Sequence, residues 1–479
     1  MPGYMWFILS FLALIVGYLI YGKVVEKVFG ADSSLKTPAY THTDGVDYVP
    51  MPKWRLFLIQ LLNIAGVGPV FGPILGALYG PTALLWVVFG NIFAGAVHDY
   101  LSGMMSVRYH GANIPEIIRF TLGNKARGVM LLFTVLPLIL AGVVFVTAPA
   151  GLLEKLCKDS FNGVLTFSVL VTLIFMYYFF ATLLPIDKLI GRIYPFFGAL
   201  LLVMALGLSV GLLIKCPTQF YSWASFDVNP HPQDLPIWPL VFITIACGAL
   251  SGFHSTQSPM MARCLKNESE GRFVFYGAMV AEGVIGLVWV TIGMTFYPDA
   301  TSLLNAIKHG GPANVVYESS YALLGTVGGL IAILGVLALP ITSGDTAFRA
   351  ARLIIAEELK IGQIKKSNRL YIALPVFFVG IILTNVDFGI IWRYFGWCNQ
   401  CIATMVFWSA SVYLYKHGRF HYIASLPACF VTYVAIAYML FEPTMGIRLN
   451  VAYANTIAVI ATAVIYFLYL TQLSHDAKL

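Results

Sequence analysis

Residues 61–73 read LLNIAGVGPVFGP and residues 245–259 read IACGALSGFHSTQSP, and in each of these apolar stretches helix-breaking residues interrupt the middle. An unpaired backbone group inside a bilayer costs several kcal/mol, so such breaks persist only where they are buried in protein or line a wet cavity. Two interrupted segments in corresponding halves of a chain are typical of a transporter's binding site. The stretches therefore predict a membrane protein built around two broken helices.

The composition agrees with this prediction. Of the 479 residues, 59% are hydrophobic and only 11% are charged, and the mean hydropathy is +0.81. A soluble domain carries about 25% charged residues, so we expect an all-α polytopic protein embedded in a lipid bilayer. The net charge of +7 is typical of basic cytoplasmic loops and does not indicate a nucleic-acid partner. The seven cysteines suggest no disulfide framework, and we expect no metal site and no cofactor.

About thirteen runs are long enough to cross roughly 30 Å of hydrocarbon. They cover residues 5–21, 54–80, 82–106, 129–150, 163–184, 190–214, 237–260, 274–297, 321–342, 369–385, 389–414, 422–441 and 452–472. With the N-terminus outside, about 23 lysines and arginines fall in inner loops and about five in outer loops. This asymmetry predicts an outer N-terminus and an inner C-terminus.

The broken segments are the second and the seventh of these spans. They are five spans apart and so cross the membrane in opposite directions, which is the arrangement of an inverted five-plus-five repeat. We expect residues 1–53 to form a transmembrane helix and a cytoplasmic loop, and residues 415–479 to form spans 12 and 13. Between them, residues 54–214 would form the first repeat and residues 237–414 the second.

The first break offers backbone groups to a ligand. Proline lacks an N–H group and glycine permits positive φ, so the break should free carbonyl groups and leave a half-helix that begins near Pro73. The N-terminus of a helix attracts anions. The alternative, a packing face of small residues, suits Gly76 and Gly80 better. The substrate-binding residues expected here are Gly66, Val67, Gly68, Pro69 and Gly72.

The second break concentrates polar side chains. A hydroxyl, an amide and an imidazole in one short stretch can hydrogen-bond a small polar substrate, and His254 can change its charge near neutral pH. The alternative is a re-entrant turn whose polar groups satisfy only its own backbone. The substrate-binding residues expected here are Ser251, Gly252, Phe253, His254 and Gln257.

Ionisable residues within spans are functional candidates. His98, Asp99 and Glu282 lie at a depth similar to that of His254, so we expect them to carry a proton through a transport cycle. The alternative is a static ion-pair network that includes Arg263 or Arg108.

A further break is expected at residues 340–344. Asp345 would then begin a helix and pair with Arg349 one turn later, in a gating or a structural role. Alternatively, Thr342, Ser343 and adjacent carbonyl groups could hold Na⁺, because hard cations prefer oxygen ligands.

Several long motifs resemble the carbon starvation protein A family of bacterial inner-membrane transporters. They are GVGPVFGPILGALYG (66–80), GAVHDYLSGMMSVRYHG (95–111), SGFHSTQSPMMARC (251–264), NESEGRFVFYGAMVAEG (267–283), ITSGDTAFRAARL (341–353) and FGWCNQ (395–400). The resemblance implies uptake of a small organic nutrient during carbon limitation, either pyruvate with protons or peptides. It also implies the five-plus-five fold of the amino acid–polyamine–organocation transporters, to which the leucine transporter belongs.

We therefore expect a secondary active transporter with alternating access around spans 2 and 7. It would import a small, pyruvate-like carboxylate by proton symport, with Na⁺ as the alternative coupling ion. A di- or tripeptide importer of the same fold is the first alternative, and a nutrient sensor or channel is the second. An enzyme is not expected, since the chain has no nucleophile–base motif, Walker A motif or GxGxxG in a βαβ context. The oligomeric state stays open.

Overall fold

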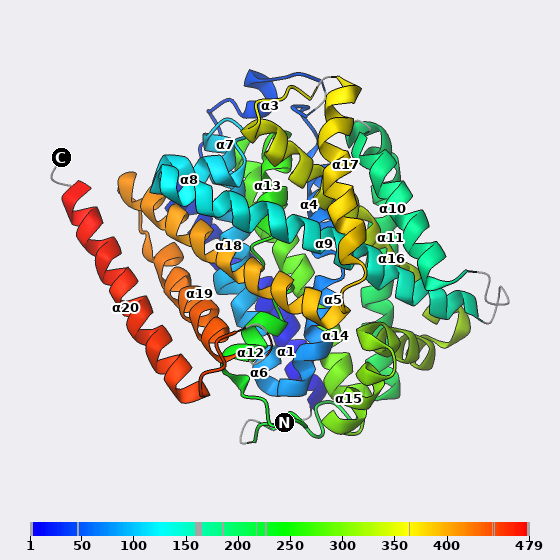
Figure 1. Cartoon of the computed structure of the whole chain (residues 1–479). Coiled ribbons are helices and arrows are strands. Elements are labelled where there is room, and N and C mark those ends of the chain that lie inside the picture. Colours follow the sequence, from blue (N-terminus) through cyan, green and yellow to red (C-terminus); the bar gives the residue numbers. More distant parts are fainter. Residues whose placement is uncertain are drawn as a thin grey trace.

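The computed structural model describes residues 3–45, 47–158, 165–183, 186–216, 218–225, 228–363, 365–442, 444 and 446–476. This part of the chain is almost entirely helical, and its β-structure is one isolated bridge between Met51 and Leu265. The helices form one bundle, with several of them steeply inclined to the others (Figure 1).

Most helices follow the expected spans. Some spans consist of several consecutive elements: α1 (Gly3–Val16), η1 (Gly17–Tyr21) and α2 (Gly22–Phe29); α4 (Lys53–Ala65) and α5 (Gly68–Gly76); α6 (Pro81–Leu85), η3 (Trp86–Gly95) and α7 (Ala96–Arg108); α12 (Ile237–Thr244) and α13 (His254–Ala262); η5 (Arg272–Tyr276) and α14 (Gly277–Phe296). The others are α9 (Asn124–Lys158), α10 (Phe167–Leu183), α11 (Ile186–Lys215), α16 (Gly311–Glu358), α17 (Lys366–Leu383), α18 (Phe388–Lys416), α19 (Tyr422–Phe441) and α20 (Val451–Asp476). The short helices are α3 (Pro38–Thr41), η2 (Ala77–Tyr79), α8 (Ile114–Leu122), η4 (Glu268–Glu270) and α15 (Ala300–Lys308).

Nine helices in the described part of the chain are long and apolar enough to cross a membrane. The bent pair α4 and α5, with an angle of 47°, would be a tenth. Three further expected spans fall outside this criterion, namely α10 with its 17 residues, the divided segment α12–α13, and α18. The structure is thus that of a multi-pass helical membrane protein, and the total of about thirteen spans stays a prediction.

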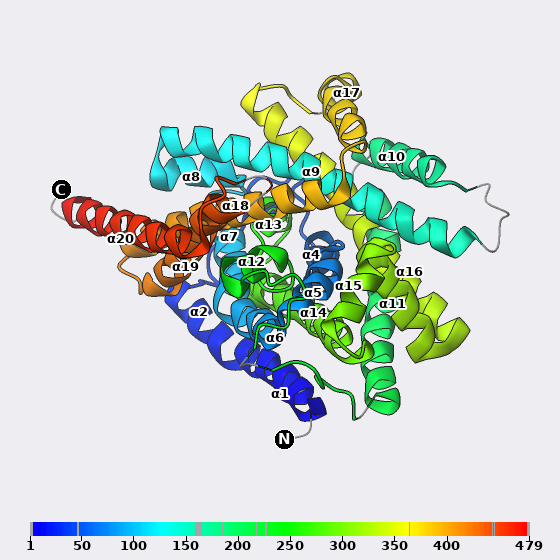
Figure 2. The ribbon, with the colours of Figure 1, turned by 60° about the horizontal axis from the view of Figure 1, so that its bottom comes forward.

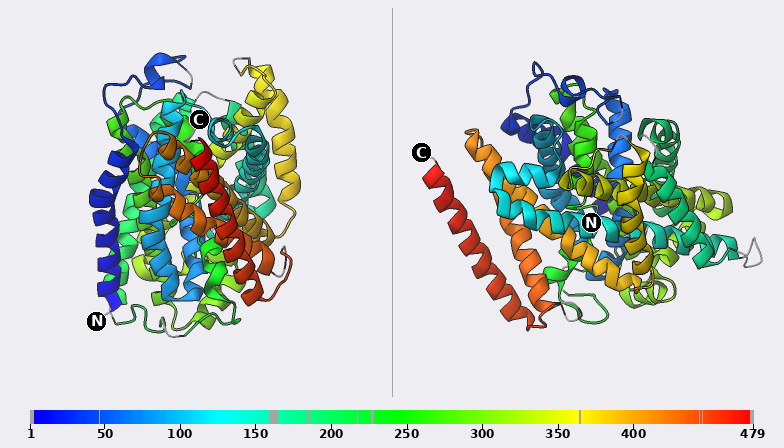
Figure 3. Two further views of the ribbon diagram at one scale, coloured as in Figure 1. Left: turned by 90° about the vertical axis from the view of Figure 1, so that its left-hand side faces the viewer. Right: turned by 45° about the horizontal axis from the view of Figure 1, so that its top comes forward.

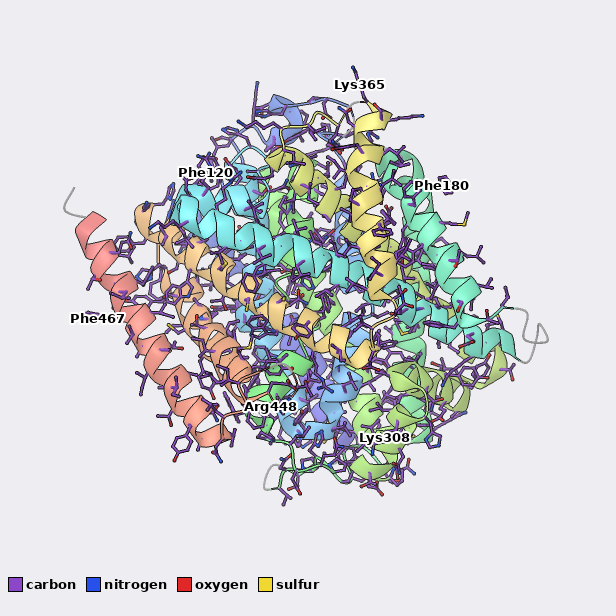
Figure 4. All side chains as sticks on the ribbon, in the orientation of Figure 1. Phe120, Phe180, Lys308, Lys365, Arg448 and Phe467 are labelled. Atoms are coloured by element: carbon purple, nitrogen blue, oxygen red, sulfur yellow. The ribbon has the colours of Figure 1, made fainter. Side chains whose placement is uncertain are left out.

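The two ends of the chain lie at opposite ends of the bundle (Figure 3). Lys308 and Arg448 lie toward the end that carries the N-terminus, and Lys365 lies at the other end (Figure 4). This is the separation that the distribution of basic residues predicts. The membrane side that each end faces, and the repeat boundaries at residues 54–214 and 237–414, stay predictions.

The interrupted helices occupy the middle of the bundle (Figure 2). Around them pack α14, α16 and α18, whereas α20 lies at the periphery and leans on α19. In the most apolar 18-residue window of each span, the share of buried residues is 11% for α20 and 22% for α1–α2. The corresponding share for the α14 span is 78%. The peripheral helices therefore present their apolar residues outward, as lipid-facing helices do.

Two local expectations are wrong. The half-helix after the first break begins at Gly68 and not near Pro73, because Pro69 fits the first turn, where its missing N–H costs nothing. The helix also does not break at residues 340–344. There α16 runs on through Pro340, so Asp345 lies inside a helix and not at its start, and the non-helical residue of α16 is Gly325, with φ of 70°.

Candidate functional site

The two breaks lie against each other. A Cβ atom on Gly68 would lie 2.4 Å from Sγ of Cys247, and one on Gly72 would lie 3.0 Å from the carbonyl oxygen of Thr244. A Cβ atom on Gly248 would contact Pro69, at 3.6 Å from its Cα. Glycines at these positions permit the backbones of spans 2 and 7 to touch. The residues expected at both breaks thus form one buried region, although they lie nearly 200 residues apart in the chain.

Span 2 breaks at Gly66 and Val67. Gly66 adopts φ of 42° and ψ of −154°, a conformation that L-residues avoid, and a Cβ atom there would lie 2.5 Å from the ring of Phe145. Its N–H donates to Oγ of Ser343, at 3.0 Å. The break is therefore held by backbone geometry and by a hydroxyl group from α16.

Thr342 and Ser343 meet the broken end of α4. Their hydroxyl groups donate to the carbonyl oxygen of Leu62, at 2.9 Å and 2.8 Å. The hydroxyl group of Thr342 also lies within hydrogen-bond distance of carbonyl oxygens of its own helix. These contacts let a polar residue lie inside α16. Two hydroxyls and a carbonyl that the break has freed thus gather at one point.

Span 7 breaks over residues 245–253, which separate α12 from α13. Helix α18 holds this segment from one side: Asn399 Oδ1 accepts a hydrogen bond from the N–H of Phe253, and Gln400 Nε2 donates to the carbonyl oxygens of Phe242 and Leu250. Buried backbone groups need such partners. The polar residues of α18 therefore stabilise the break.

Four titratable side chains, all with 0% exposure, form a chain beside the second break. His98 Nδ1 lies 2.9 Å from Asp99 Oδ1, and Asp99 Oδ2 lies 2.9 Å from Nδ1 of His254. His254 Nε2 lies 3.4 Å from Glu282 Oε2, while Glu282 Oε1 accepts from the N–H of Gly248, at 3.1 Å. The structure thus brings the expected ionisable residues together across α7, α13 and α14.

Two of these four titratable groups, together with a cysteine, also have the donor set of a cation site. Cys247 Sγ, one ring nitrogen of His254 and one carboxylate oxygen of Glu282 lie within 4.8 Å of one another. A thiolate, an imidazole and a carboxylate are ligands that transition metals accept. The tertiary structure thus adds the thiol of Cys247, which the sequence did not single out, to the site.

Next to the second break, Oε1 of Gln257 in α13 lacks a hydrogen-bond partner within the described residues, and Ser251 within the break has the thiol of Cys247 as its side-chain partner. Ser251 and Gln257 are both 0% exposed. A buried polar atom without a partner costs about 1–3 kcal/mol. Beside them, the rings of Phe145, Phe253 and Phe395 pack edge to face. This region therefore offers hydrogen bonds and an apolar wall to a small ligand.

Asp345 and Arg349 form the expected ion pair, with Nη2 of Arg349 3.3 Å from Oδ1 of Asp345. The same Nη2 donates to the carbonyl oxygen of Ala181 near the end of α10. The pair therefore ties α16 to α10, and the structure does not group it with the broken segments.

Sequence reasoning missed Asn91 and Trp86, which lie in η3. Asn91 Nδ2 donates to the carbonyl oxygens of Gly248 and Met279, and Trp86 Nε1 donates to that of Ile245. Asn91 is a polar residue in the otherwise apolar segment 86–95. That signal could have found it, since buried polar groups in membranes usually have a specific partner.

The helical bundle and its central pair of broken helices have the leucine-transporter fold. In a comparison with solved structures, the chain matches the crystal structure of MhsT in complex with L-phenylalanine with a TM-score of 0.59, at 14% sequence identity, over 87% of this chain and 98% of that one. The model of the carbon starvation protein CstA family matches residues 3–173 and 154–316. The chain belongs to this family.

Three relatives illustrate the range of the family. An uncharacterised membrane protein of Haemophilus influenzae is 48% identical, over 64% of this chain and 95% of its own length. The peptide transporter CstA of Escherichia coli is 25% identical, over 89% of this chain and 79% of its own length. The pyruvate/proton symporter BtsT of Escherichia coli is 26% identical, over 64% of this chain and 51% of its own length.

Proposed function

We propose that this protein imports a small carboxylate, with pyruvate as the reference substrate, by proton symport. The observation that carries the proposal is the chain of four buried titratable groups beside the contact of the two breaks. An enzyme role is not proposed. The bacterial inner membrane, with an outer N-terminus and an inner C-terminus, is the proposed location.

The substrate would lie where spans 2 and 7 are interrupted. Helices α5 and α13 both begin there, and the N-terminus of a helix favours a carboxylate group. Ser251 and Gln257 would supply further hydrogen bonds, and Phe253 would contact the apolar part of the substrate. The residues around the breaks are buried in this conformation, so substrate would enter and leave through alternating access to the two sides of the membrane.

Protons would use the chain His98–Asp99–His254–Glu282. Each of these groups can bind a proton. The distances between the nearest side-chain atoms of successive groups are 2.9–3.4 Å, which is about the length of a hydrogen bond. Only His254 and Glu282 belong to the cation donor set with Cys247, whereas a proton pathway uses all four groups. Glu282 is the central candidate because it also accepts the N–H of Gly248 in the second break.

Two alternatives rest on particular observations. Sodium could replace the proton, because Thr342, Ser343 and the carbonyl group of Leu62 converge, and unwound backbone in such transporters coordinates Na⁺. A peptide could replace the carboxylate, as the name of the relative CstA of Escherichia coli suggests.

The first test is uptake of radiolabelled pyruvate into proteoliposomes under an imposed inward proton gradient. We expect accumulation that a protonophore abolishes. Accumulation of dipeptide alone would favour the peptide alternative, and accumulation that requires a sodium gradient would favour Na⁺ coupling.

Glu282→Gln tests the proton pathway. Glutamine keeps an acceptor for Gly248 but cannot change charge, so gradient-driven accumulation should fall to background while exchange of labelled for unlabelled pyruvate continues. Glu154→Gln, at the far end of α9, is the control and should retain both activities. Proton-driven accumulation that persists after joint replacement of His98, Asp99 and Glu282 would rule out this pathway.

A further inference from the structure

Span 3 contains an unusual helix. The ten residues of η3, Trp86–Gly95, form a π-helix, whereas π-helices are rare, are mostly single turns and are frequent at functional sites. This one lies directly against the second break and against α14, because its hydrogen bonds reach both. The proposed substrate and proton residues do not include any part of it.

The π geometry aims two side chains of η3 at the same target. Trp86 and Asn91 are five residues apart and donate to the carbonyl oxygens of Ile245 and Gly248, at 3.1 Å and 2.9 Å. In an α-helix, residues five apart point about 140° away from each other. In a π-helix the bonds join residues i and i+5, so the two residues lie one turn apart on one face. The local winding therefore decides that both donors reach the broken segment.

The side chain of Asn91 is also buried and tightly packed. It is 0% exposed, and its second bond from Nδ2 reaches the carbonyl oxygen of Met279 in α14, at 2.8 Å. A Cβ atom on Gly283 would lie 2.4 Å from this Nδ2, and one on Gly95 would lie 2.2 Å from the carbonyl oxygen of Ala249. Glycines at these two positions thus let η3 approach both α14 and the second break.

Gly248 is held from two sides. Its carbonyl oxygen accepts from Asn91, and its N–H donates to Oε1 of Glu282, at 3.1 Å. Its φ of 86° is a conformation that other residues rarely adopt. A residue with this freedom needs outside partners to keep one orientation, and Asn91 and Glu282 are these partners.

We propose that Asn91 is a positioning residue of the second break: it fixes Gly248 against α14, so that the N–H of Gly248 faces Glu282. Its effect on transport rests on the proposed role of Glu282, while its effect on the broken segment does not. Without Asn91, the carbonyl groups of Gly248 and Met279 lose their donor, and the segment gains freedom to move away from α14.

The test that does not depend on transport uses Cys247, which is buried and directly precedes Gly248. Purified wild type, Asn91→Ala and Asn91→Asp are treated with N-ethylmaleimide, and alkylation of each cysteine is followed by peptide mass spectrometry. Loss of two hydrogen bonds at about 1 kcal/mol each predicts that Cys247 reacts at least about tenfold faster in both variants. Cys398, which is buried in α18, should react at the wild-type rate.

The control is Asn314→Ala. Asn314 also has a buried amide that donates to a backbone carbonyl, that of Ala306, but it lies near the start of α16. It should leave the reactivity of Cys247 unchanged. If the Asn91 variants do not fold, Trp86→Phe removes the companion bond to Ile245 and should speed alkylation of Cys247 by a smaller factor. Alkylation at the wild-type rate in folded Asn91 or Trp86 variants would overturn the proposal.

The second readout is gradient-driven uptake of pyruvate. Asn91→Ala should lower it through the contact of Gly248 with Glu282, and Asn314→Ala should leave it at the wild-type rate. Uptake at the wild-type rate in a folded Asn91→Ala variant contradicts the proposal. Absence of proton-driven uptake in wild type would instead overturn the proposed function, and the alkylation rates would still decide the role of Asn91.

Discussion

At the scale of single residues, the site depends on positions where a side chain would not fit. Gly66, Gly68 and Gly72 bring span 2 against Phe145, Cys247 and Thr244. These contacts leave no space for a Cβ atom, which would lie within 3.0 Å of its neighbour at each position. The glycines therefore do more than interrupt a helix, because they determine how closely the broken helices pack.

Gly66→Ala should abolish pyruvate uptake and destabilise the protein. The new methyl group would meet the Phe145 ring, and the backbone conformation of Gly66 costs a non-glycine residue about 1–3 kcal/mol. Uptake and the thermal unfolding midpoint measure the two effects. Gly128→Ala is the control, because Gly128 lies in α9 with open space around its Cα. Wild-type uptake by Gly66→Ala would show that the break tolerates a side chain.

At the scale of elements, α18 acts as a support for a segment that has no regular structure of its own. Asn399 and Gln400 are adjacent in the chain and contact both ends of the second break. Helix α16 does the same for the first break through Thr342 and Ser343. Each break thus has one neighbouring helix that pairs its free backbone groups.

Asn399→Ala should weaken the second break. The N–H of Phe253 would lose its acceptor, at a cost of about 1–3 kcal/mol for an unsatisfied buried group. We expect a lower thermal unfolding midpoint and weaker pyruvate binding. Asn455→Ala is the control, since Asn455 accepts a hydrogen bond from Tyr433 between the peripheral helices α19 and α20. Equal effects of the two substitutions would contradict a special role for Asn399.

At the scale of the whole molecule, one end of the bundle is closed by Arg263, which follows α13 directly. Its Nε donates to the carbonyl oxygen of Gly111 at 2.8 Å, and its Nη2 lies 3.3 Å from Oε1 of Glu357 at the end of α16. Arg263 is 6% exposed, so its bond to Gly111 is buried, whereas Glu357 is 51% exposed and its contact with Arg263 is partly open to water. The contact joins span 7 to the loop before α8 and to α16 on the proposed cytoplasmic side.

Arg263→Ala should favour conformations that are open at this end. Loss of the hydrogen bonds of a charged group, at about 1.5–3 kcal/mol, predicts about tenfold faster maleimide labelling of a cysteine placed by Ser258→Cys in α13. Arg119→Ala is the matched control, because the pair of Arg119 with Glu116 lies in the short α8 and is partly exposed. Unchanged labelling after Arg263→Ala would show that other contacts keep this end closed.

The amino-acid sequence alone determined the class of protein and the fact that spans 2 and 7 are interrupted, whereas the break of span 7 lies at residues 245–253 and the expected polar residues from His254 onward are helical. Apolar composition, proline and glycine act locally, and the signatures of the transporter family lie in contiguous motifs. The sequence also singled out His98, Asp99, His254 and Glu282 as membrane-embedded ionisable residues. Their mutual contacts could not be read from it, because they come from three helices that meet only after packing.

Only the tertiary structure decided which groups complete the site. Cys247, Asn91 and Asn399 join it because helices distant in sequence surround the second break and must pair its buried backbone. The two wrong expectations, about α5 and α16, have local causes. Pro69 fits the first turn of α5, where its missing N–H costs nothing, and the hydroxyl of Thr342 bonds to carbonyl groups of its own helix and does not interrupt α16.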